Sequence, residues 1–336
     1  MNAHAPLAIG IDIGGTHAKI GLVSVDGAIS VFRRIPTRAQ GTDPGPFLED
    51  LIANAREVRT AAPAPPIGIG ISTHGYIDDA RRGPIVCANT PALRGVDLRG
   101  LFAETFGLPA LVNNDLTAHA LAEYHYGSGR GARRFLCMAM GTGLGAGVVI
   151  NGQALRFIGG KAGDTGRVIV VPDGPPDVYG ARGSAEALCG VPGIERLARR
   201  EYGRDVPAHE VIRAAREGAD ERAVRVMAQI GDYLGQALAS LCSIYLPERV
   251  AITGGTAEAG APLLDACRRR FDALVADYHR AIVESAPDFY SGVEIVLGEM
   301  RGETGMVGAV VEIFQTEAER AFAGHGQPDR HPHRPG

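Results

Sequence analysis

Apolar runs that lead into glycine turns predict strands at two places in the chain. Residues 7–13 are apolar and run into Gly14-Gly15, and a further apolar run ends at the tight turn Asp26-Gly27. The same order recurs from residues 134–140 onwards, where another glycine turn and then Asn151-Gly152 follow. Each stretch is typical of a strand, a glycine turn, a strand, a tight hairpin and a strand. The repeat indicates two halves built on one plan.

Helical and strand patterns alternate between and after these two stretches. Prolines and glycines bound the helices, and the strands are short apolar runs. Helices are expected at 47–61, 98–106, 117–126, 184–201, 207–217, 219–246, 261–284 and 304–322, and strands at 67–71, 110–112, 249–253 and 293–297. This alternation predicts an α/β fold with largely buried sheets. The last stretch, 324–336, is rich in Pro, Gly, His and Arg and is expected to be a disordered tail.

Composition and charge narrow the class of protein. The 336 residues carry a formal net charge of −4, which argues against nucleic-acid binding because that needs a basic face. No apolar run is long enough to span a membrane, and the first residues do not resemble a signal peptide. The five scattered cysteines indicate reduced, buried thiols in a cytoplasmic protein. The 46 glycines indicate many turns and close backbone approach to a ligand.

The first glycine turn has the composition of an anion site. Backbone N–H groups of Gly14 and Gly15 can approach phosphate oxygens closely, and Thr16 and Lys19 add a hydroxyl and an ammonium donor. Asp12 is placed to hold a hydrated Mg²⁺ beside the phosphates. The segment matches neither the P-loop nor the GxGxxG pattern, and taken alone a plain hairpin turn explains it equally well.

Two further glycine turns favour a nucleotide cleft. Gly141-Thr142-Gly143 follows one expected strand, and Gly254-Gly255 follows another. Three glycine turns at strand ends indicate one cleft that holds a polyphosphate and its nucleoside. If the nucleotide is ATP, the chemistry needs a base for an acceptor hydroxyl, and Asp115 is the best-placed carboxylate. The alternative is that Asp115 only caps the helix that follows it.

Together these segments resemble the ROK family of sugar kinases, within the actin-like ATPase superfamily, over about residues 7–315. The matching segments are Asp12–Lys19 with the family's DxGGTxxK loop, Asn114-Asp115 with its catalytic pair, Gly141–Gly147 with its GTGxGxG loop, Gly254-Gly255 with its adenosine-side pair, and Asn89-Thr90-Pro91 with its sugar-side segment. The resemblance implies phosphoryl transfer from MgATP to a hexose hydroxyl, usually at C6, with Asp115 as the base. It also implies a homodimer.

The same resemblance implies two ribonuclease-H-like domains hinged about a cleft for ATP and sugar. We place the N-terminal domain at residues 1–117, completed by the helix at 304–322, and the C-terminal domain at 118–303. Gly75, Asn89 and Asn114 then lie on the sugar side. His74 is either a donor to the acceptor or an ordinary loop histidine.

The sugar side departs from the family pattern. Residues 164–167 read Asp-Thr-Gly-Arg where the family has Glu-x-Gly-His, whose Glu and His touch sugar hydroxyls. Arg167 either pairs with Asp164 or Glu186 and reshapes the pocket, or meets an unusual acceptor, or faces solvent or an internal partner without touching the substrate. Glu186 keeps its place and is expected to accept hydrogen bonds from sugar hydroxyls. A shorter acid and an arginine predict an acceptor other than plain glucose, such as an amino sugar or a C7-cyclitol.

The family's zinc motif is also lost. Its CxCGxxGCxE pattern corresponds to residues 177–186, where Asp177, Tyr179 and Ser184 replace the three cysteines, and its histidine ligand is replaced by Arg167. A tetrahedral zinc site cannot form from what remains without borrowed ligands. We therefore expect no structural zinc, and we expect packing and hydrogen bonds to hold the loop at 172–186.

Two other functions are considered. A transcriptional repressor of this family would carry an N-terminal helix-turn-helix, for which the chain leaves no room before Asp12, so DNA binding is not expected. A catalytically inactive sugar-binding or regulatory protein stays open because of the altered sugar side. The donor also stays open, between ATP, another nucleotide and polyphosphate.

Overall fold

The two glycine-turned strand sets form the centres of two five-stranded sheets. The computed structural model describes residues 5–324. The first sheet has the order β3 (Ile29–Pro36), β2 (His17–Ser24), β1 (Leu7–Ile13), β4 (Ile69–Thr73), β7 (Ala110–Asn114), and the second has the order β10 (Gln153–Ala154), β9 (Leu144–Ile150), β8 (Arg134–Met140), β11 (Arg249–Thr253), β12 (Glu294–Leu297). In each sheet the first three strands pair antiparallel and the next two pair parallel. The prediction that the two halves of the chain are built on one plan is confirmed.

The helices match the expected ones with one correction. The α-helices of the described chain are α1 (Gly45–Thr60), α2 (Leu98–Phe106), α3 (Asp115–Tyr126), α4 (Ala185–Cys189), α5 (Val191–Tyr202), α6 (Ala208–Glu217), α7 (Glu221–Tyr245), α8 (Ala261–Ser285) and α9 (Thr304–Gly324). The prediction of a single helix over 184–201 was wrong, because the backbone of Gly190 is extended, with φ −70° and ψ 170°, and separates α4 from α5. Pro192 in the first turn of α5 explains the restart, since proline belongs at a helix start and not in its interior.

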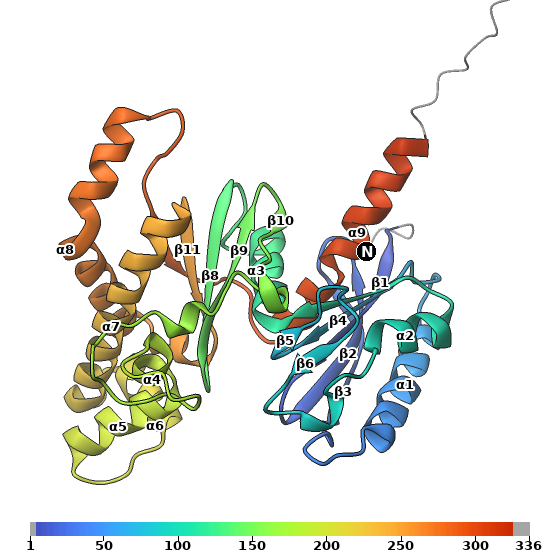
Figure 1. Cartoon of the computed structure of the whole chain (residues 1–336), viewed down its shortest axis with the longest axis horizontal. Coiled ribbons are helices and arrows are strands. Elements are labelled where there is room, and N and C mark those ends of the chain that lie inside the picture. Colours follow the sequence, from blue (N-terminus) through green and yellow to red (C-terminus); the bar gives the residue numbers. More distant parts are fainter. Residues whose placement is uncertain (1–4, 325–336) are drawn as a thin grey trace, which may run out of the picture.

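The first sheet is covered by helices on both faces because side chains alternate along its strands. From β1, Ile9 and Ile11 face the cluster that contains Phe47 of α1 and Phe102 of α2. Ala8 of the same strand packs with Met306 of α9 on the opposite face. Figure 1 shows α1 and α2 on the outside of the molecule and α9 on the inner side.

The second sheet repeats this arrangement. Met138 and Met140 of β8 are fully buried in the cluster that contains α7 and α8, as the strand pattern predicted. Phe135 and Cys137, on the other face of β8, pack against Leu121 of α3. The helices α4 to α8 therefore form the outer layer of this half, and α3 lies on the inner side (Figure 1).

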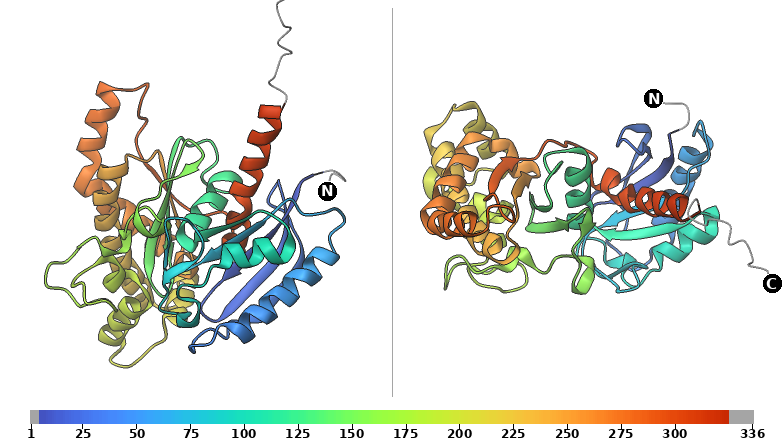
Figure 2. Two further views of the ribbon diagram at one scale, coloured as in Figure 1. Left: turned by 45° about the vertical axis from the view of Figure 1, so that its right-hand side comes forward. Right: turned by 90° about the horizontal axis from the view of Figure 1, so that it is seen from above.

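Helices α3 and α9 pack against each other between the two sheets, as both views in Figure 2 show. Their backbones come so close that a Cβ on Gly308 would lie 1.7 Å from the carbonyl oxygen of Ala118, so only glycine fits there. The helix at the end of the described chain thus covers the first sheet. The boundary after residue 117 stays a prediction, since α3 starts at Asp115 and contacts both halves.

Several smaller expectations have clear outcomes. All five cysteines are free and buried, as expected. A two-stranded sheet of β5 (Tyr76–Ile77) and β6 (Pro84–Val86) was not predicted. The expected tail at 324–336 lies outside the described residues, apart from its first residue, which ends α9. Within residues 5–324, none of the helices combines the length and the apolar character that crossing a bilayer requires.

Candidate functional site

Asp115 is the first residue of α3, directly after the end of β7. Asn114 is the N-cap, because its Oδ1 accepts the N–H of Leu116 at 3.0 Å. Asp115 Oδ1 accepts the same N–H at 2.9 Å, so capping occupies one of its two oxygens. The amide of Asn114 donates to the carbonyl oxygen of Gly75 at 2.8 Å, which fixes the start of α3 against the 74–75 loop.

The 74–75 loop joins Asp115 to the first glycine turn. His74 Nε2 accepts the N–H of Asn89 at 3.0 Å, and a Cβ on Gly15 would lie 3.1 Å from the Cβ of Asn89. Gly75 has φ +96°, and a Cβ there would lie 1.9 Å from the carbonyl oxygen of Val86, so glycine is required. The ring of His74 thus binds Asn89 through Nε2. Burial lowers the pKa of His74, although the negative charge of Asp115 acts to raise it.

The side chain of Asp12, a residue of β1, lies against the start of α9. A Cβ on Gly305 would lie 2.6 Å from Asp12 Oδ1, so the carboxyl group rests against the first turn of that helix. Burial raises the pKa of Asp12, while the nearby His119 and Lys19 act to lower it. The ammonium of Lys19 donates to the carbonyl oxygen of Gly302 at 3.2 Å. His119 was interpreted from the sequence as a solvated or core-edge residue with no role in the site; the structure places it on the helix that Asp115 begins, close enough to act on the charge of Asp12.

The second and third glycine turns lie side by side. The N–H of Gly141 donates to the carbonyl oxygen of Gly143 at 2.9 Å, which closes a tight turn after β8. Gly254 has φ +86°, and a Cβ there would lie 2.2 Å from the carbonyl oxygen of Met140. A Cβ on Gly141 or Gly255 would meet nothing within 4 Å. The backbone of the two turns is therefore open to close approach by a ligand at Gly141 and Gly255, and we call this open backbone surface the cradle.

Glu186 contacts both the second glycine turn and Arg167. Its Oε2 accepts the N–H of Leu144 at 3.2 Å, and a Cβ on Gly143 would lie 2.6 Å from the same oxygen. Its Oε1 lies 3.5 Å from Nη2 of Arg167. Arg167 is paired with both predicted acids, which agrees with the first alternative and equally with an internally paired arginine that does not touch the substrate.

Asp164 joins the two halves of the molecule. Tyr76 Oη donates to its Oδ2 at 2.5 Å, Lys161 Nζ donates to its Oδ1 at 2.6 Å, and Arg167 Nη1 lies 3.1 Å from Oδ2. Burial acts to raise the pKa of Asp164, but the hydrogen bonds from Lys161 and Tyr76 hold that pKa below its ordinary value. Sequence reasoning missed both donors. Lys161 had a short-range signal, whereas Tyr76 is 88 residues away and had none.

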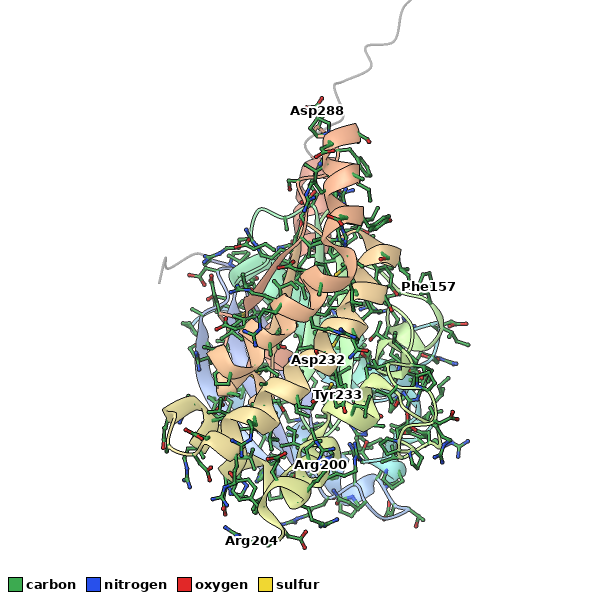
Figure 3. The ribbon with its side chains drawn as sticks, turned by 90° about the vertical axis from the view of Figure 1, so that its left-hand side faces the viewer. Phe157, Arg200, Arg204, Asp232, Tyr233 and Asp288 are labelled. Atoms are coloured by element: carbon green, nitrogen blue, oxygen red, sulfur yellow. The ribbon has the colours of Figure 1, made fainter. Side chains whose placement is uncertain are left out.

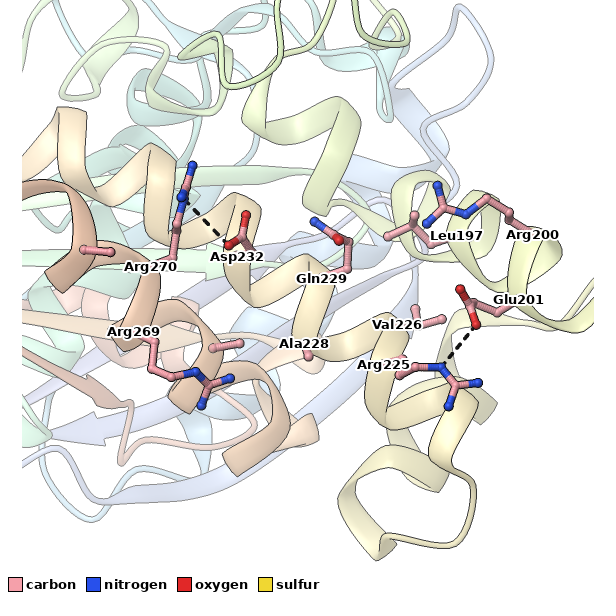
Figure 4. A pocket seen from close by; sticks show the side chains of 12 residues that line it. Leu197, Arg200, Glu201, Arg225, Val226, Ala228, Gln229, Asp232, Arg269 and Arg270 are labelled. Carbon is pink, nitrogen blue, oxygen red and sulfur yellow. Dashed lines mark hydrogen bonds and ion pairs between the residues drawn. The ribbon is translucent and has the colours of Figure 1, made fainter.

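A surface pocket of about 630 Å³ lies elsewhere, between α5, α7 and α8. Figure 3 shows Arg200 and Asp232 on this helical face, and Figure 4 shows two ion pairs across the pocket, Arg225 with Glu201 and Arg270 with Asp232. No predicted site residue lines it. In the described part of the chain no group of three or more His, Cys, Asp or Glu side chains is arranged to hold a metal ion.

The residues around the candidate site match a known family. Residues 8–315 match the ROK family. The chain belongs to the ROK family. A glucokinase of Halalkalibacterium halodurans is 31% identical over 327 residues, which cover 92% of this chain and 95% of the relative. A xylose repressor of Bacillus subtilis is 24% identical over 316 residues, which cover 94% of this chain and 79% of the relative.

Solved structures show the same fold. A ROK hexokinase from Thermus thermophilus is 28% identical with a TM-score of 0.76, and the match covers 93% of this chain and 99% of that chain. A ROK glucokinase from Streptomyces griseus in complex with glucose and AMPPNP is 26% identical with a TM-score of 0.71, covering 90% of this chain and 97% of that chain. This ROK protein therefore has the two-domain actin-like ATPase fold expected from its sequence.

Proposed function

We propose that this ROK protein is a kinase that transfers a phosphoryl group from MgATP to a primary hydroxyl of a hexose or hexose-like acceptor, with Asp115 as general base. Membership of the family and the glucokinase and hexokinase relatives support the reaction class. The observation that carries the proposal is the position of Asp115. It starts α3 beside the 74–75 loop, and that loop binds Asn89, which packs against Gly15 of the first glycine turn.

The glycine turns form the proposed nucleotide side. The residues assigned to it are Gly14, Gly15, Thr16, Lys19, Gly141, Thr142, Gly143, Gly254 and Gly255, with Asp12 holding Mg²⁺ through water. The open space at Gly141 and Gly255 supports this assignment, because a ligand can reach the backbone there. MgATP, when bound, supplies the phosphoryl group and neutralises the charge that develops on it.

Asp115 is suited to take the proton of the acceptor hydroxyl. Its Oδ1 is held by the N–H of Leu116, and within the described residues no hydrogen bond reaches its Oδ2. The oxygen Oδ2 is therefore the proposed proton acceptor. Asn114 keeps the start of α3 in place through its bond to Gly75, so the carboxylate has a fixed position.

The acceptor side is proposed to consist of Gly75, Asn89, Asn114, Asp164, Arg167 and Glu186. The carboxylate of Asp164 already accepts from two donors and pairs with Arg167, and Glu186 is engaged by Leu144 and Arg167. These acids offer fewer free lone pairs to sugar hydroxyls than isolated carboxylates would, and Arg167 adds only donors. This supports an acceptor other than plain glucose, with an amino sugar or a C7-cyclitol as the favoured classes.

The test is ADP release by the purified protein with MgATP over a panel of glucose, mannose, fructose, N-acetyl and amino hexoses and C7-cyclitols. We expect turnover above background with one class and a loss of about 10²- to 10⁴-fold in Asp115→Asn. The matched control is Asp265→Asn, a change of an exposed carboxylate on α8, which should leave turnover unchanged.

Two results would count against the proposal. A wide preference for plain glucose would contradict the acceptor class but not the reaction. Equal inactivity of wild type and Asp115→Asn on every acceptor would contradict the kinase. Homodimer formation and a cytoplasmic location stay predictions, and sedimentation of the purified protein checks the first.

A further inference from the structure

Arg167 lies at the centre of three carboxylates from three separate segments. Its Nη1 is 3.1 Å from Asp164, its Nη2 is 3.5 Å from Glu186, and its Nε is 3.6 Å from Asp177. The guanidinium carbon also lies 4.6 Å from the ring centre of Tyr179. A planar guanidinium presents donors on three separate nitrogens and so faces the three carboxylates from three sides, whereas an ammonium presents all its donors from one nitrogen. We call Arg167, Asp164, Asp177 and Glu186 the Arg167 clamp.

Asp177 is the part of the Arg167 clamp that depends most on the arginine. Its side chain is only 1% exposed. Its Oδ1 accepts the N–H groups of Tyr179 and Ala181 at 2.9 and 3.0 Å, and its Oδ2 accepts the hydroxyl of Ser184 at 3.1 Å. Among the residues that the structure describes, Arg167 provides the only basic group within 4 Å of this carboxylate. Removing the guanidinium would leave a buried charge without a counter-charge.

The loop that Asp177 organises has little apolar burial of its own. At its tip, Val178 is 80% exposed and Tyr179 is 61% exposed. Isolated bridges pair Ile169 with Ser184 and Pro176 with Arg182. Segments with few buried apolar contacts open at low free-energy cost, so polar contacts decide whether this loop is ordered. Backbone bonds from Val170 and Val171 to Gly183 hold the base of the loop. The hydrogen bonds of Asp177 hold the turn at its tip, and the ion pair of Asp177 with Arg167 ties that turn to the residue 167 segment.

A zinc ion does not fit here. The resemblance places four zinc ligands at the positions of Arg167, Asp177, Tyr179 and Ser184, and the structure brings these four side chains together. Only Asp177 among them is a good zinc ligand, and the guanidinium supplies a positive charge and no lone pair. The four positions that hold zinc in the family thus still converge, but a guanidinium group lies where they meet.

We propose that the Arg167 clamp replaces the metal: the guanidinium of Arg167 fixes the loop at 173–184 through Asp177 and, with the same group, sets the positions of Asp164 and Glu186. Arg167 is a positioning residue in this proposal. Its effect on the loop stands on the contacts alone. Its effect on acceptor binding rests on the proposed function, because it is the proposed function that assigns Asp164 and Glu186 to the acceptor side.

Hydrogen exchange of the loop amides, followed by mass spectrometry, tests the first part without any activity. In Arg167→Gln we expect the amides of residues 173–184 to exchange about ten-fold faster or more, while those of α3 keep their wild-type rates. Arg167→Lys keeps the charge but reaches fewer carboxylates, and should give an intermediate rate. Arg182→Gln is the matched control, since this exposed arginine of the same loop makes only a 3.4 Å bond to the carbonyl oxygen of Asp173.

The contradicting result is a loop that exchanges at the same rate in Arg167→Gln and in Arg182→Gln. If Arg167→Gln does not fold, which exchange of the α3 amides would reveal, Arg167→Lys decides: an unchanged loop rate overturns the proposal and a faster one supports it. Faster loop exchange of the wild type in the presence of a chelator would also overturn it, because the proposed centre is not a metal.

Restoring the family's zinc ligands tests whether residues 167, 177, 179 and 184 lie close enough to share one centre. The variant Arg167→His, Asp177→Cys, Tyr179→Cys, Ser184→Cys should bind about one Zn²⁺ per chain, and a chelator should then speed exchange of its loop. The wild type should hold no zinc after the same preparation. A folded variant that binds no zinc would contradict the proposed shared centre.

Kinetics separate this proposal from the proposed function. If the protein is a kinase, Arg167→Lys should raise KM for the acceptor more than KM for ATP, because the displaced carboxylates lie on the acceptor side. A protein without kinase activity would overturn the proposed function and the acceptor part, while the loop-exchange result would still decide the first part.

Discussion

The two sides of the candidate site differ in what lines them: the backbone of glycine turns on one side and charged side chains on the other. The proposed nucleotide side is lined by backbone: a Cβ on Gly254 would collide with Met140, whereas one on Gly141 or Gly255 would meet nothing within 4 Å. The proposed acceptor side consists of charged side chains centred on Asp164 and Arg167. A backbone surface changes little with sequence, whereas one substitution alters a side-chain network. The chain keeps the family pattern at its glycine turns and departs from it around Arg167.

The largest expected effect on stability lies on the backbone side. Gly254→Ala would force a side chain into a φ of +86° and place its Cβ 2.2 Å from the carbonyl oxygen of Met140. We expect the free energy of unfolding to fall by about 2–3 kcal/mol. Denaturant unfolding followed by circular dichroism measures this loss.

Its neighbour provides the matched control. A Cβ on Gly255 meets nothing within 4 Å, and its φ is not in the left-handed region, so Gly255→Ala should change stability by less than about 0.5 kcal/mol. If the cradle binds a nucleotide, Gly255→Ala should still raise KM for ATP. Equal destabilisation by the two variants would contradict the distinction between a required glycine and an open one.

Much of the backbone side could be predicted from the sequence because its signals are local. Apolar runs and glycine pairs such as Gly14-Gly15 identify strand ends within a few residues, and their recurrence predicted that the two halves share one plan, which the two sheets confirm. Asp115 was found in the same way, as the carboxylate between a strand and a helix. The break at Gly190 was missed because the apolar pattern continues through it.

The acceptor side could not be predicted to the same degree, because its contacts join residues far apart in the chain. Substitutions at Asp177 and Arg167 were visible, and they led us to expect no structural zinc, but nothing in the sequence showed that the two side chains still meet. Tyr76 belongs to a strand of two residues, too short for any periodicity. Its bond to Asp164 depends on how the two halves pack.

The next effect in size concerns Asp164 on the acceptor side. Asp164→Asn removes the negative charge that two donors and Arg167 share, and we expect a loss of about 1–2 kcal/mol in the free energy of unfolding at neutral pH. Because the folded pKa of Asp164 is lowered, its contribution is complete above the ordinary value of 3.8 and disappears as pH falls below it. The difference between wild type and variant should therefore vanish in acid.

An exposed ion pair is the control for this prediction. Glu299→Gln breaks the pair with Arg130, whose two side chains are 58% and 64% exposed, and should cost less than about 0.5 kcal/mol at any pH. A loss in Asp164→Asn no larger than this would show that the acceptor side is held by something other than its charges.

The smallest expected effect tests the link between the two halves. Tyr76→Phe removes the 2.5 Å bond to Asp164 and should lower the free energy of unfolding by about 0.5–1.5 kcal/mol. That hydrogen bond raises the pKa of Tyr76 to about 12, so the stabilisation is complete below its ordinary value of 10 and is lost as pH rises towards 12. Melting temperatures of wild type and variant should differ at pH 8 and converge above pH 10. Tyr179→Phe, which removes an exposed hydroxyl while keeping the ring beside Arg167, should match the wild type throughout. A Tyr76→Phe protein as stable as wild type at pH 8 would mean that packing alone, without this bond, joins the halves at the acceptor side.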